Sequence, residues 1–231
     1  MLCHTVNVSP RRTAPDARTA LIEIGARLLD EEGPQALTTR RIANEAGSST
    51  MAVYTHFGAL SGLVREMVHE GFDRLQRHLT AVRRTDDPVA DMALLGRAYR
   101  YNALANSHLY AVMFGGSSLG GFSLSEEDRQ SGRYTLANVT TCAARCIAAG
   151  RFRAGDPELI AHQAWSGLHG LITLELGHYL IEPYDAESLF EVQLVGLMTS
   201  AGDDNQAAAR SVDASRKRFQ HEVGWIPAGG A

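Results

Sequence analysis

The segment from Leu37 to Phe57 restricts the possible folds of this chain more than any other stretch. It holds two short runs with the apolar spacing of helices, separated by Gly47. Glycine readily adopts the positive φ that a tight turn between two helices requires. Thr38 starts the first run, and Ser49 is placed to cap the second. The apolar positions are Ile42, Ala43, Ala46, Ala52 and Val53. This pattern predicts a helix-turn-helix.

The remaining chain also has the apolar periodicity of helices. We expect a first helix that ends at Gly33-Pro34 and a long fourth helix over about 61–84. Further helices are expected at 88–106, 107–114, 125–149, 157–181 and 185–200. The glycine-rich segment 115–121 reads as a flexible connection. No strand-like alternation and no internal repeat stands out, so the sequence predicts an all-α fold.

Composition narrows the class of protein. The net charge of −4 argues weakly against a nucleic-acid binder, but arginine exceeds acid within residues 1–84 and acid exceeds arginine after them. No apolar run is long enough for a membrane helix, and the first residues are too polar for a secretory signal. Cys3, Cys142 and Cys146 form no disulfide framework. We therefore expect a cytoplasmic protein that does not contact the membrane.

The helix-turn-helix resembles the DNA-binding head of the tetracycline-repressor (TetR) family. The resemblance depends on Leu28, Gly33, Thr38, Ile42-Ala43, Ala46-Gly47-Ser48-Ser49 and Val53-Tyr54-Thr55-His56-Phe57, and continues to Leu63. It implies a three-helix head joined by a long fourth helix to an α-helical ligand-binding and dimerisation domain. Family members often have Val in place of Ser48 and a phosphate-binding Lys in place of Leu60, so one expected DNA contact is missing here.

The resemblance also divides the chain. We expect a flexible N-terminal arm at 1–13, in which Arg11 and Arg12 lie along the duplex, and a DNA-binding head at 14–60. The effector-binding and dimerisation domain would occupy 61–200. Residues 201–231 are rich in Ala, Asp, Gly and Arg, and we expect a partly disordered tail there, with a frayed helix followed by a disordered end.

Roles in DNA binding follow by position. The resemblance implies phosphate contacts from Thr38 and Thr39, and a phosphate or base contact from Arg40. Thr50, Met51 and Thr55 would read base edges, with Met51 against a thymine methyl group. Tyr54 and His56 would hold phosphates, although His56 packing against the first helix is nearly as plausible from the sequence. Ser49 completes this DNA-binding set.

The body contains Trp165 followed by His169-Gly170, which resembles the Trp-His-Gly (WHG) type of TetR regulatory domain. Helix 157–181 is apolar on most sides and should be buried nearly all round. Gly167 and Gly170 would allow a second helix to approach closely. With helix 185–200 it would form half of a four-helix homodimer interface. The second helix would contribute Leu189, Val192, Val195, Leu197 and Met198.

An effector pocket is expected inside the body, where aromatic area is mixed with a few polar groups. Core packing explains the same residues equally well. The candidate lining residues are Tyr99, Asn102, Ala103, Tyr110, Met113, Phe114, Trp165, His169 and Thr173.

These features predict a transcriptional regulator, favoured as a repressor that binds a pseudo-palindromic operator as a dimer and is released by a small molecule. It needs no cofactor and no metal, and it has no enzyme motif. Alternatives are a metal sensor using His108, His162, His169 and His178, a thiol sensor using Cys142 and Cys146, and a regulator without any effector. A helical protein-binding adaptor is the alternative from another class.

Overall fold

The computed structural model describes residues 17–114, 125–126, 130 and 132–224, and these residues contain helices and no strands. The all-α prediction is therefore confirmed. The helices are α1 (Ala17–Glu32), a short 3-10 turn η1 (Pro34–Ala36), α2 (Thr39–Glu45), α3 (Thr50–Phe57), α4 (Leu60–Ala81), α5 (Pro88–Ala105), α6 (Ser107–Phe114), α8 (Arg133–Ala148), α9 (Pro157–Leu176), α10 (Ala186–Ala201) and α11 (Asn205–Glu222).

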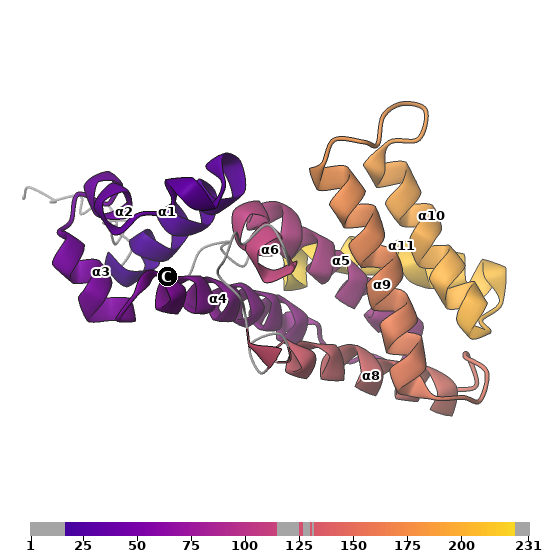
Figure 1. Ribbon diagram of the computed structural model, residues 1–231. Helices are drawn as coiled ribbons and strands as arrows, with labels where there is room; N and C mark the ends of the chain where they lie inside the picture. Colours follow the sequence, from indigo (N-terminus) through magenta and orange to yellow (C-terminus); the bar gives the residue numbers. More distant parts are fainter. Residues whose placement is uncertain (1–16, 115–124, 127–129, 131, 225–231) are drawn as a thin grey trace, which may run out of the picture.

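Helices α1, α2 and α3 form a small head at one end of the molecule (Figure 1). Gly47 lies between α2 and α3 with a φ of 60°, as the turn requires. Apolar side chains from the three helices and from the start of α4 share one core. Its fully buried members include Leu21, Ile22, Leu28, Ile42, Val53 and Leu63.

Helix α4 joins the head to the body (Figure 1). Its 22 residues span about 33 Å at the usual rise per residue. The head half buries Leu63, Val64 and Met67, and the body half buries Leu75 and Leu79. One continuous helix therefore contributes to both cores, so a shift of its body half is carried to the head.

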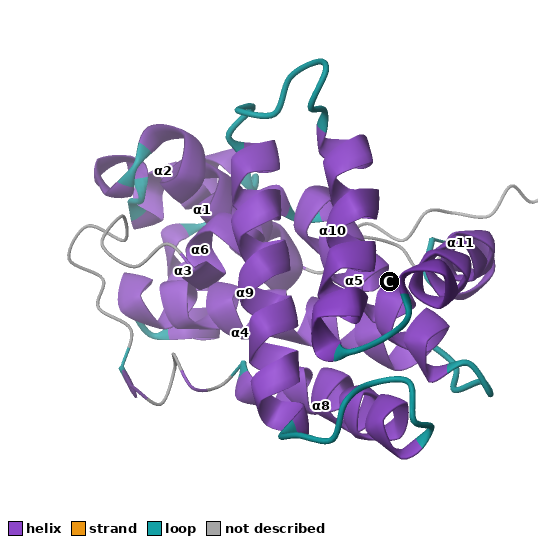
Figure 2. Ribbon diagram, turned by 90° about the vertical axis from the view of Figure 1, so that its right-hand side faces the viewer, coloured by secondary structure: helices purple, strands orange, loops and turns teal. Residues whose placement is uncertain are grey.

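The body is built around α5, which is buried along most of its length. Helices α4, α8, α9 and α11 pack against it, and α10 packs against α9 and α11. Figure 2 shows α9 and α10 side by side, joined by a loop that projects from one end of the pair. Within the described residues, no helix is long and apolar enough to cross a membrane.

Residues 205–222 form α11, which is packed along the body and is not the frayed helix expected in this part of the tail. This helix buries Ala208, Ser211, Val212 and Ser215 against the body. Arg97 of α5 donates to the Ser215 hydroxyl at 2.8 Å and to the Val212 carbonyl at 3.1 Å. The buried stripe is narrow and partly made of serine, so it lacks a strong apolar pattern in sequence.

The expected length and burial of α9 differ from the structure. Helix α9 ends at Leu176 instead of 181, because Gly177 and the positive-φ residue His178 turn the chain away. It is buried on one face only, through Ala161, Ala164, Leu168 and Ile172. The arm at 1–13 and the connection at 115–121 lie outside the described residues.

Candidate nucleic-acid interface and ligand cavity

The N-termini of α2 and α3 are capped as the sequence suggested. The Thr38 hydroxyl accepts a hydrogen bond from the Arg41 backbone N–H, and the Ser49 hydroxyl accepts one from that of Ala52, both at 3.3 Å. These two hydroxyls stabilise the helix starts. Their role inside the protein therefore competes with the direct DNA contacts expected of Thr38 and Ser49.

The outer face of α3 is exposed to solvent. Val53 and Phe57 point into the core, whereas the other side is exposed. Met51 is 68% exposed and Tyr54 is 50% exposed, which is unusual for large apolar and aromatic side chains that have no surface task. The exposed residues on this face are Thr50, Met51, Tyr54, Thr55 and His56.

Two of the expected contacts have partners within the head. The Thr55 hydroxyl donates to the Met51 carbonyl of its own helix at 2.9 Å. The His56 ring is exposed and lies 5.9 Å from the Phe57 ring, so it packs beside its neighbour and not against α1. Thr39 is half-buried at the first turn of α2.

The two adjacent arginines of α2 differ in their surroundings. Arg41 makes two hydrogen bonds of 2.7 Å to the Glu32 carboxylate and one of 3.1 Å to Glu45. Arg40 is exposed and makes no ion pair with any residue in the described part of the chain. Arg40 is therefore the α2 cation that is available to an external phosphate.

At the start of α4, Leu60 occupies the position where TetR-family members often have a phosphate-binding lysine. The Leu60 side chain is partly buried against the core, and Ala59 provides no side-chain cap. The α4 N-terminus therefore offers backbone N–H groups without the lysine that the family resemblance leads one to expect.

A cavity of about 480 Å³ lies in the body. Of the predicted pocket residues, Tyr99, Met113, Phe114 and Trp165 line it. The others lie outside the lining. Asn102 and Ala103 are buried in α5, and Tyr110, His169 and Thr173 lie behind or beside the wall. The lining residues that the sequence did not single out are Phe72, Leu75, Leu79, Met92, Leu95, Gly96, Gly132, Arg133, Thr135, Leu136, Val139, His162, Ala164, Leu168, Leu194, Leu197 and Met198.

The predicted polar residues form a chain of hydrogen bonds at the cavity wall. Trp165 Nε1 donates to the Tyr99 hydroxyl at 3.3 Å, which lies 2.9 Å from the Tyr110 hydroxyl. The Tyr110 hydroxyl lies 2.6 Å from His169 Nδ1. Burial raises the pKa of Tyr99 to about 12 and also raises that of Tyr110, while burial lowers the pKa of His169. These shifts favour the uncharged form of all three side chains at neutral pH.

A second polar network joins the head to the body and was not predicted. Arg74 of α4 is almost fully buried. It donates to Glu70 and to Asn106 at 2.8 Å, and pairs with Glu23 of α1 at 2.5 Å. Asn106 in turn donates to the Asn102 carbonyl at 3.0 Å. In the sequence, nothing distinguishes Arg74 from the other arginines of α4, so its contacts with α1 and with the end of α5 could not be predicted.

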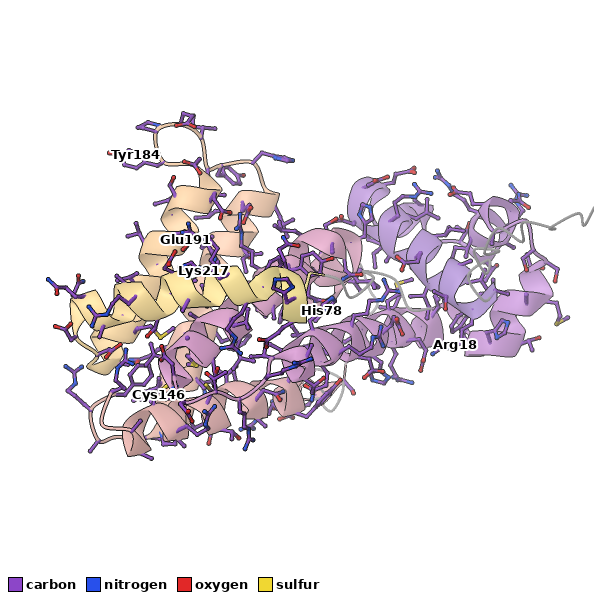
Figure 3. The ribbon with its side chains drawn as sticks, turned by 180° about the vertical axis from the view of Figure 1, so that it is seen from behind. Arg18, His78, Cys146, Tyr184, Glu191 and Lys217 are labelled. Carbon is purple, nitrogen blue, oxygen red and sulfur yellow. The ribbon has the colours of Figure 1, made fainter. Side chains whose placement is uncertain are left out.

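His78 lies one turn further along α4, where the end of α11 approaches (Figure 3). Its Nδ1–H donates to the Arg74 carbonyl at 2.9 Å, and its ring packs edge-on against Tyr101. Burial lowers the pKa of His78, so the ring is neutral at physiological pH. On the α6 side, His108 Nδ1 lies 2.9 Å from Asp30 of α1, which makes a second contact between head and body.

The sensor alternatives receive no support from the described residues. Cys142 and Cys146 are buried, and the Cys142 thiol donates to the Pro88 carbonyl at 3.3 Å. A hydrogen bond with Cys142 and burial both raise the pKa of Cys146, which disfavours the reactive thiolate. In the part of the chain that the structure covers, no three His, Cys, Asp or Glu side chains gather as a metal site would need.

The outer faces of α9 and α10 carry apolar side chains that nothing within the described chain covers. Leu159 and Leu174 of α9 are exposed, and Val192 of α10 is 70% exposed. Space around Gly170 is open. Gly167, by contrast, lets Gln193 of α10 approach inside the same chain, and Met198 belongs to the chain's own core.

Two family models match the chain. Residues 21–67 match the model described as bacterial regulatory proteins of the tetR family, and residues 92–197 match a tetracyclin repressor-like C-terminal domain. The second description does not name the WHG type, so that finer resemblance stays a prediction. The matched models are described as regulatory or repressor-like, not as enzymes.

Similar proteins agree with these matches. An HTH-type transcriptional regulator of Mycobacterium bovis, Mb1846, is 30% identical over 120 residues, which cover 49% of this chain and 50% of that protein. The chain thus matches about half the length of this curated relative. An uncharacterized HTH-type regulator of Mycobacterium tuberculosis, Rv0681, is 28% identical over 188 residues, covering 79% and 80% of the two chains. The TetR-family regulator PfmR of Thermus thermophilus has a similar fold, with a TM-score of 0.62, 22% identity and coverage of 80% and 99%.

Proposed function

Because the chain belongs to the TetR family of bacterial transcriptional regulators, we propose that it binds operator DNA as a homodimer, represses transcription, and releases DNA when a small molecule binds its body. It acts in the cytoplasm, where operator DNA is found. The observation that carries this proposal is the outer face of α3, which exposes Met51 and Tyr54 while its inner face is locked into the head.

The exposed face has the chemistry that a recognition helix needs. Thr50 offers a short hydroxyl side chain at the start of α3, Met51 offers an apolar surface for a thymine methyl group, and Tyr54 reaches outward to a phosphate. Arg40 on α2 adds an exposed cation to the head. Phosphate contacts set the position of the helix, and base-edge contacts in the major groove give sequence preference.

The homodimer is supported by the uncovered apolar residues of α9 and α10. Two copies that pair these helices would form a four-helix bundle and cover Leu174 and Val192. The open space at Gly170 lets a helix of a second copy approach. A twofold dimer places two heads about 34–36 Å apart, so that each reads one half of a pseudo-palindrome.

Effector release is supported by the cavity in the body. Phe72, Leu75 and Leu79 of α4 line it, and α4 also belongs to the head. A ligand that prefers one packing of these side chains shifts the position of α4. Coupling of this kind typically changes affinity by about 5- to 150-fold.

Binding to the DNA upstream of the protein's own gene tests the proposal. We expect saturable binding that weakens with salt, measured by fluorescence anisotropy on labelled fragments. Arg40→Gln should weaken binding and reduce the salt slope by about one per head. Arg210→Gln, at an exposed position of α11, is the matched control and should leave binding unchanged.

A combined Thr50→Ala and Tyr54→Ala variant separates DNA binding from folding. Both side chains are exposed, so the variant should melt like the wild type yet lose operator binding. Val192→Glu should convert the dimer to a monomer in light scattering and weaken operator binding. Absence of binding to every intergenic fragment of the gene neighbourhood would contradict the proposal. Unchanged activity in the Thr50 and Tyr54 variant would favour the adaptor alternative.

A further inference from the structure

The lining of the body cavity has an uneven chemistry. Most of it is aliphatic or aromatic, with contributions from α4, α5, α6, α8, α9 and α10. No Asp or Glu lines the cavity within the described part of the chain, and its one charged lining residue there is Arg133. An uncompensated cation would be costly to transfer into such a site. The composition therefore disfavours a cationic ligand and permits an anionic end group at one place only.

The volume of the cavity limits the size of the apolar part of a ligand. At about 480 Å³, it is roughly three times the volume of an apolar cavity that holds one benzene molecule (about 150 Å³). A chain of about a dozen carbons or a body of two to three fused rings matches that volume. A metabolite that consists mainly of polar groups would leave Phe72, Leu75 and Leu168 without apolar contacts.

The deep polar groups are already satisfied by the protein. Trp165 Nε1 donates to Tyr99, and the Tyr99 hydroxyl is bonded onward to Tyr110. Among the lining side chains that the structure describes, none leaves a buried nitrogen or oxygen without a partner. The ligand therefore needs no polar group at the tyrosine end, and its polar group belongs at the charged position.

Arg133 is placed to receive that polar group. It is the first residue of α8, and the positive end of the helix dipole adds to the positive potential there. No acidic residue in the first turn of α8 offsets this potential. Its guanidinium pairs with Glu158 at 3.4 Å, and both side chains are more than half exposed. An exposed pair of this length contributes little to stability, so a ligand carboxylate can replace Glu158 at small cost.

We propose that the cavity binds an apolar acid, a molecule with an apolar body and a single carboxylate, whose body fills the space among α4, α5, α8, α9 and α10 and whose carboxylate pairs with Arg133. This inference rests on the effector role of the cavity under the proposed function, and it names the class of effector. The ligand binds in the cavity reversibly and forms no covalent bond with the protein.

Three probes with the same twelve-carbon chain test the charge preference directly: dodecanoate, dodecanol and dodecyltrimethylammonium, each below its micelle concentration. Trp225→Phe leaves Trp165 in the cavity wall as the one remaining tryptophan, so its fluorescence reports occupancy. We expect dodecanoate to bind about two- to fivefold more tightly than dodecanol, as an ion pair with an exposed guanidinium provides, and the cation to bind most weakly.

Variants test whether Arg133 causes the preference for dodecanoate. Arg133→Gln should lower dodecanoate affinity to that of dodecanol and leave dodecanol unchanged, whereas Arg210→Gln should change neither. Val139→Phe places a ring in the cavity and should weaken all three probes without lowering the melting temperature. Anthracene-9-carboxylate against dodecanoate then distinguishes a ring body from a chain body, and either result supports the proposal.

The proposal is overturned if dodecyltrimethylammonium binds as tightly as dodecanoate, if Arg133→Gln leaves the ratio of dodecanoate to dodecanol unchanged, or if no acid binds a protein that still binds operator DNA. That last result leaves the proposed DNA binding intact. Dodecanoate binding to a protein that binds no DNA would instead remove the repressor function and retain the ligand class.

Discussion

Asn in place of Asp91 removes one charge from the point where four segments of the body meet. Asp91 is 2% exposed, and its carboxylate accepts from Arg145 at 2.8 Å and from Arg218 at 2.6 Å. It also accepts from the backbone N–H and the hydroxyl of Thr85, at 2.9 Å and 2.7 Å. The contacts tie the end of α4, through the loop at 82–87, to α5, α8 and α11.

The expected cost follows from burial. Breaking a buried ion pair usually costs about 3–5 kcal/mol. Arg145 and Arg218 are 28% and 19% exposed and regain some water when the charge is lost, so we expect about 2–3 kcal/mol for Asp91→Asn. For a chain of this length that lowers the melting temperature by about 4–12 °C.

Thermal unfolding followed by circular dichroism at pH 7 measures the effect, at one fixed protein concentration because a dimer's stability depends on it. Asp213→Asn is the matched control. Asp213 is exposed and pairs only across one helical turn with Lys217, so its replacement should leave the melting temperature unchanged. Equal melting curves for Asp91→Asn and the wild type would refute the role given to this carboxylate.

The same carboxylate predicts a pH dependence. Burial alone would raise the pKa of Asp91, but hydrogen bonds from Thr85, Arg218 and Arg145 outweigh it and hold the pKa below its ordinary value of 3.8. The unfolded chain therefore binds the proton more readily than the folded one. The stability contribution is complete above about pH 4 to 5 and is lost as the pH falls through the folded pKa. The difference between wild type and Asp91→Asn should be constant from about pH 5 to 8 and narrow below about pH 4.

Three further perturbations have defined outcomes. A chain ended after Asp204 lacks α11, so it should lose cooperative melting in calorimetry, because the α11 contacts of Arg97 disappear. Tyr99→Phe breaks the hydrogen-bond chain at the cavity wall and should lower stability by about 1–2 kcal/mol in urea titration, with no loss of operator binding. In Gly47→Ala the new methyl group meets open space, but the φ of 60° is strained for alanine, so the free energy of unfolding should fall by about 1 kcal/mol in the same titration. An unchanged midpoint would show that the turn does not strain alanine.

The head could be predicted from sequence because its determinants are local. Thr38 and Ser49 cap the helices that follow them within three residues, and Gly47 provides a turn that no other residue type adopts as easily. Apolar spacing then identifies the inner face of each short helix. The same spacing identifies the residues on the outer face, whereas their expected roles as DNA contacts came from the resemblance to the TetR family.

The cavity could not be predicted in the same way. Apolar residues that line a cavity have the same helical spacing as apolar residues that fill a core. The sequence therefore does not distinguish Leu75 and Leu168, which line the cavity, from Leu94, which is buried in the core. The aromatic residues were a partial guide, since Tyr99 and Trp165 line the space whereas Tyr110 supports them from behind. Arg133 was missed because one exposed arginine at a helix start resembles any solvated charge.

Under the proposed effector release, helix α4 is the connection between a ligand in the cavity and the head. Phe72, Leu75 and Leu79 face the cavity, whereas Arg74 and His78 on the same helix face the network that reaches Glu23 of the head. Its far end is held through the Asp91 contacts. In the proposed effector response, a side-chain rearrangement in the cavity moves α4 toward the head, where Arg74 and the Asp30–His108 contact connect the head to the body. Replacing Arg74 by Met should therefore reduce the loss of operator affinity that dodecanoate causes, although Arg74 is not among the residues that line the cavity.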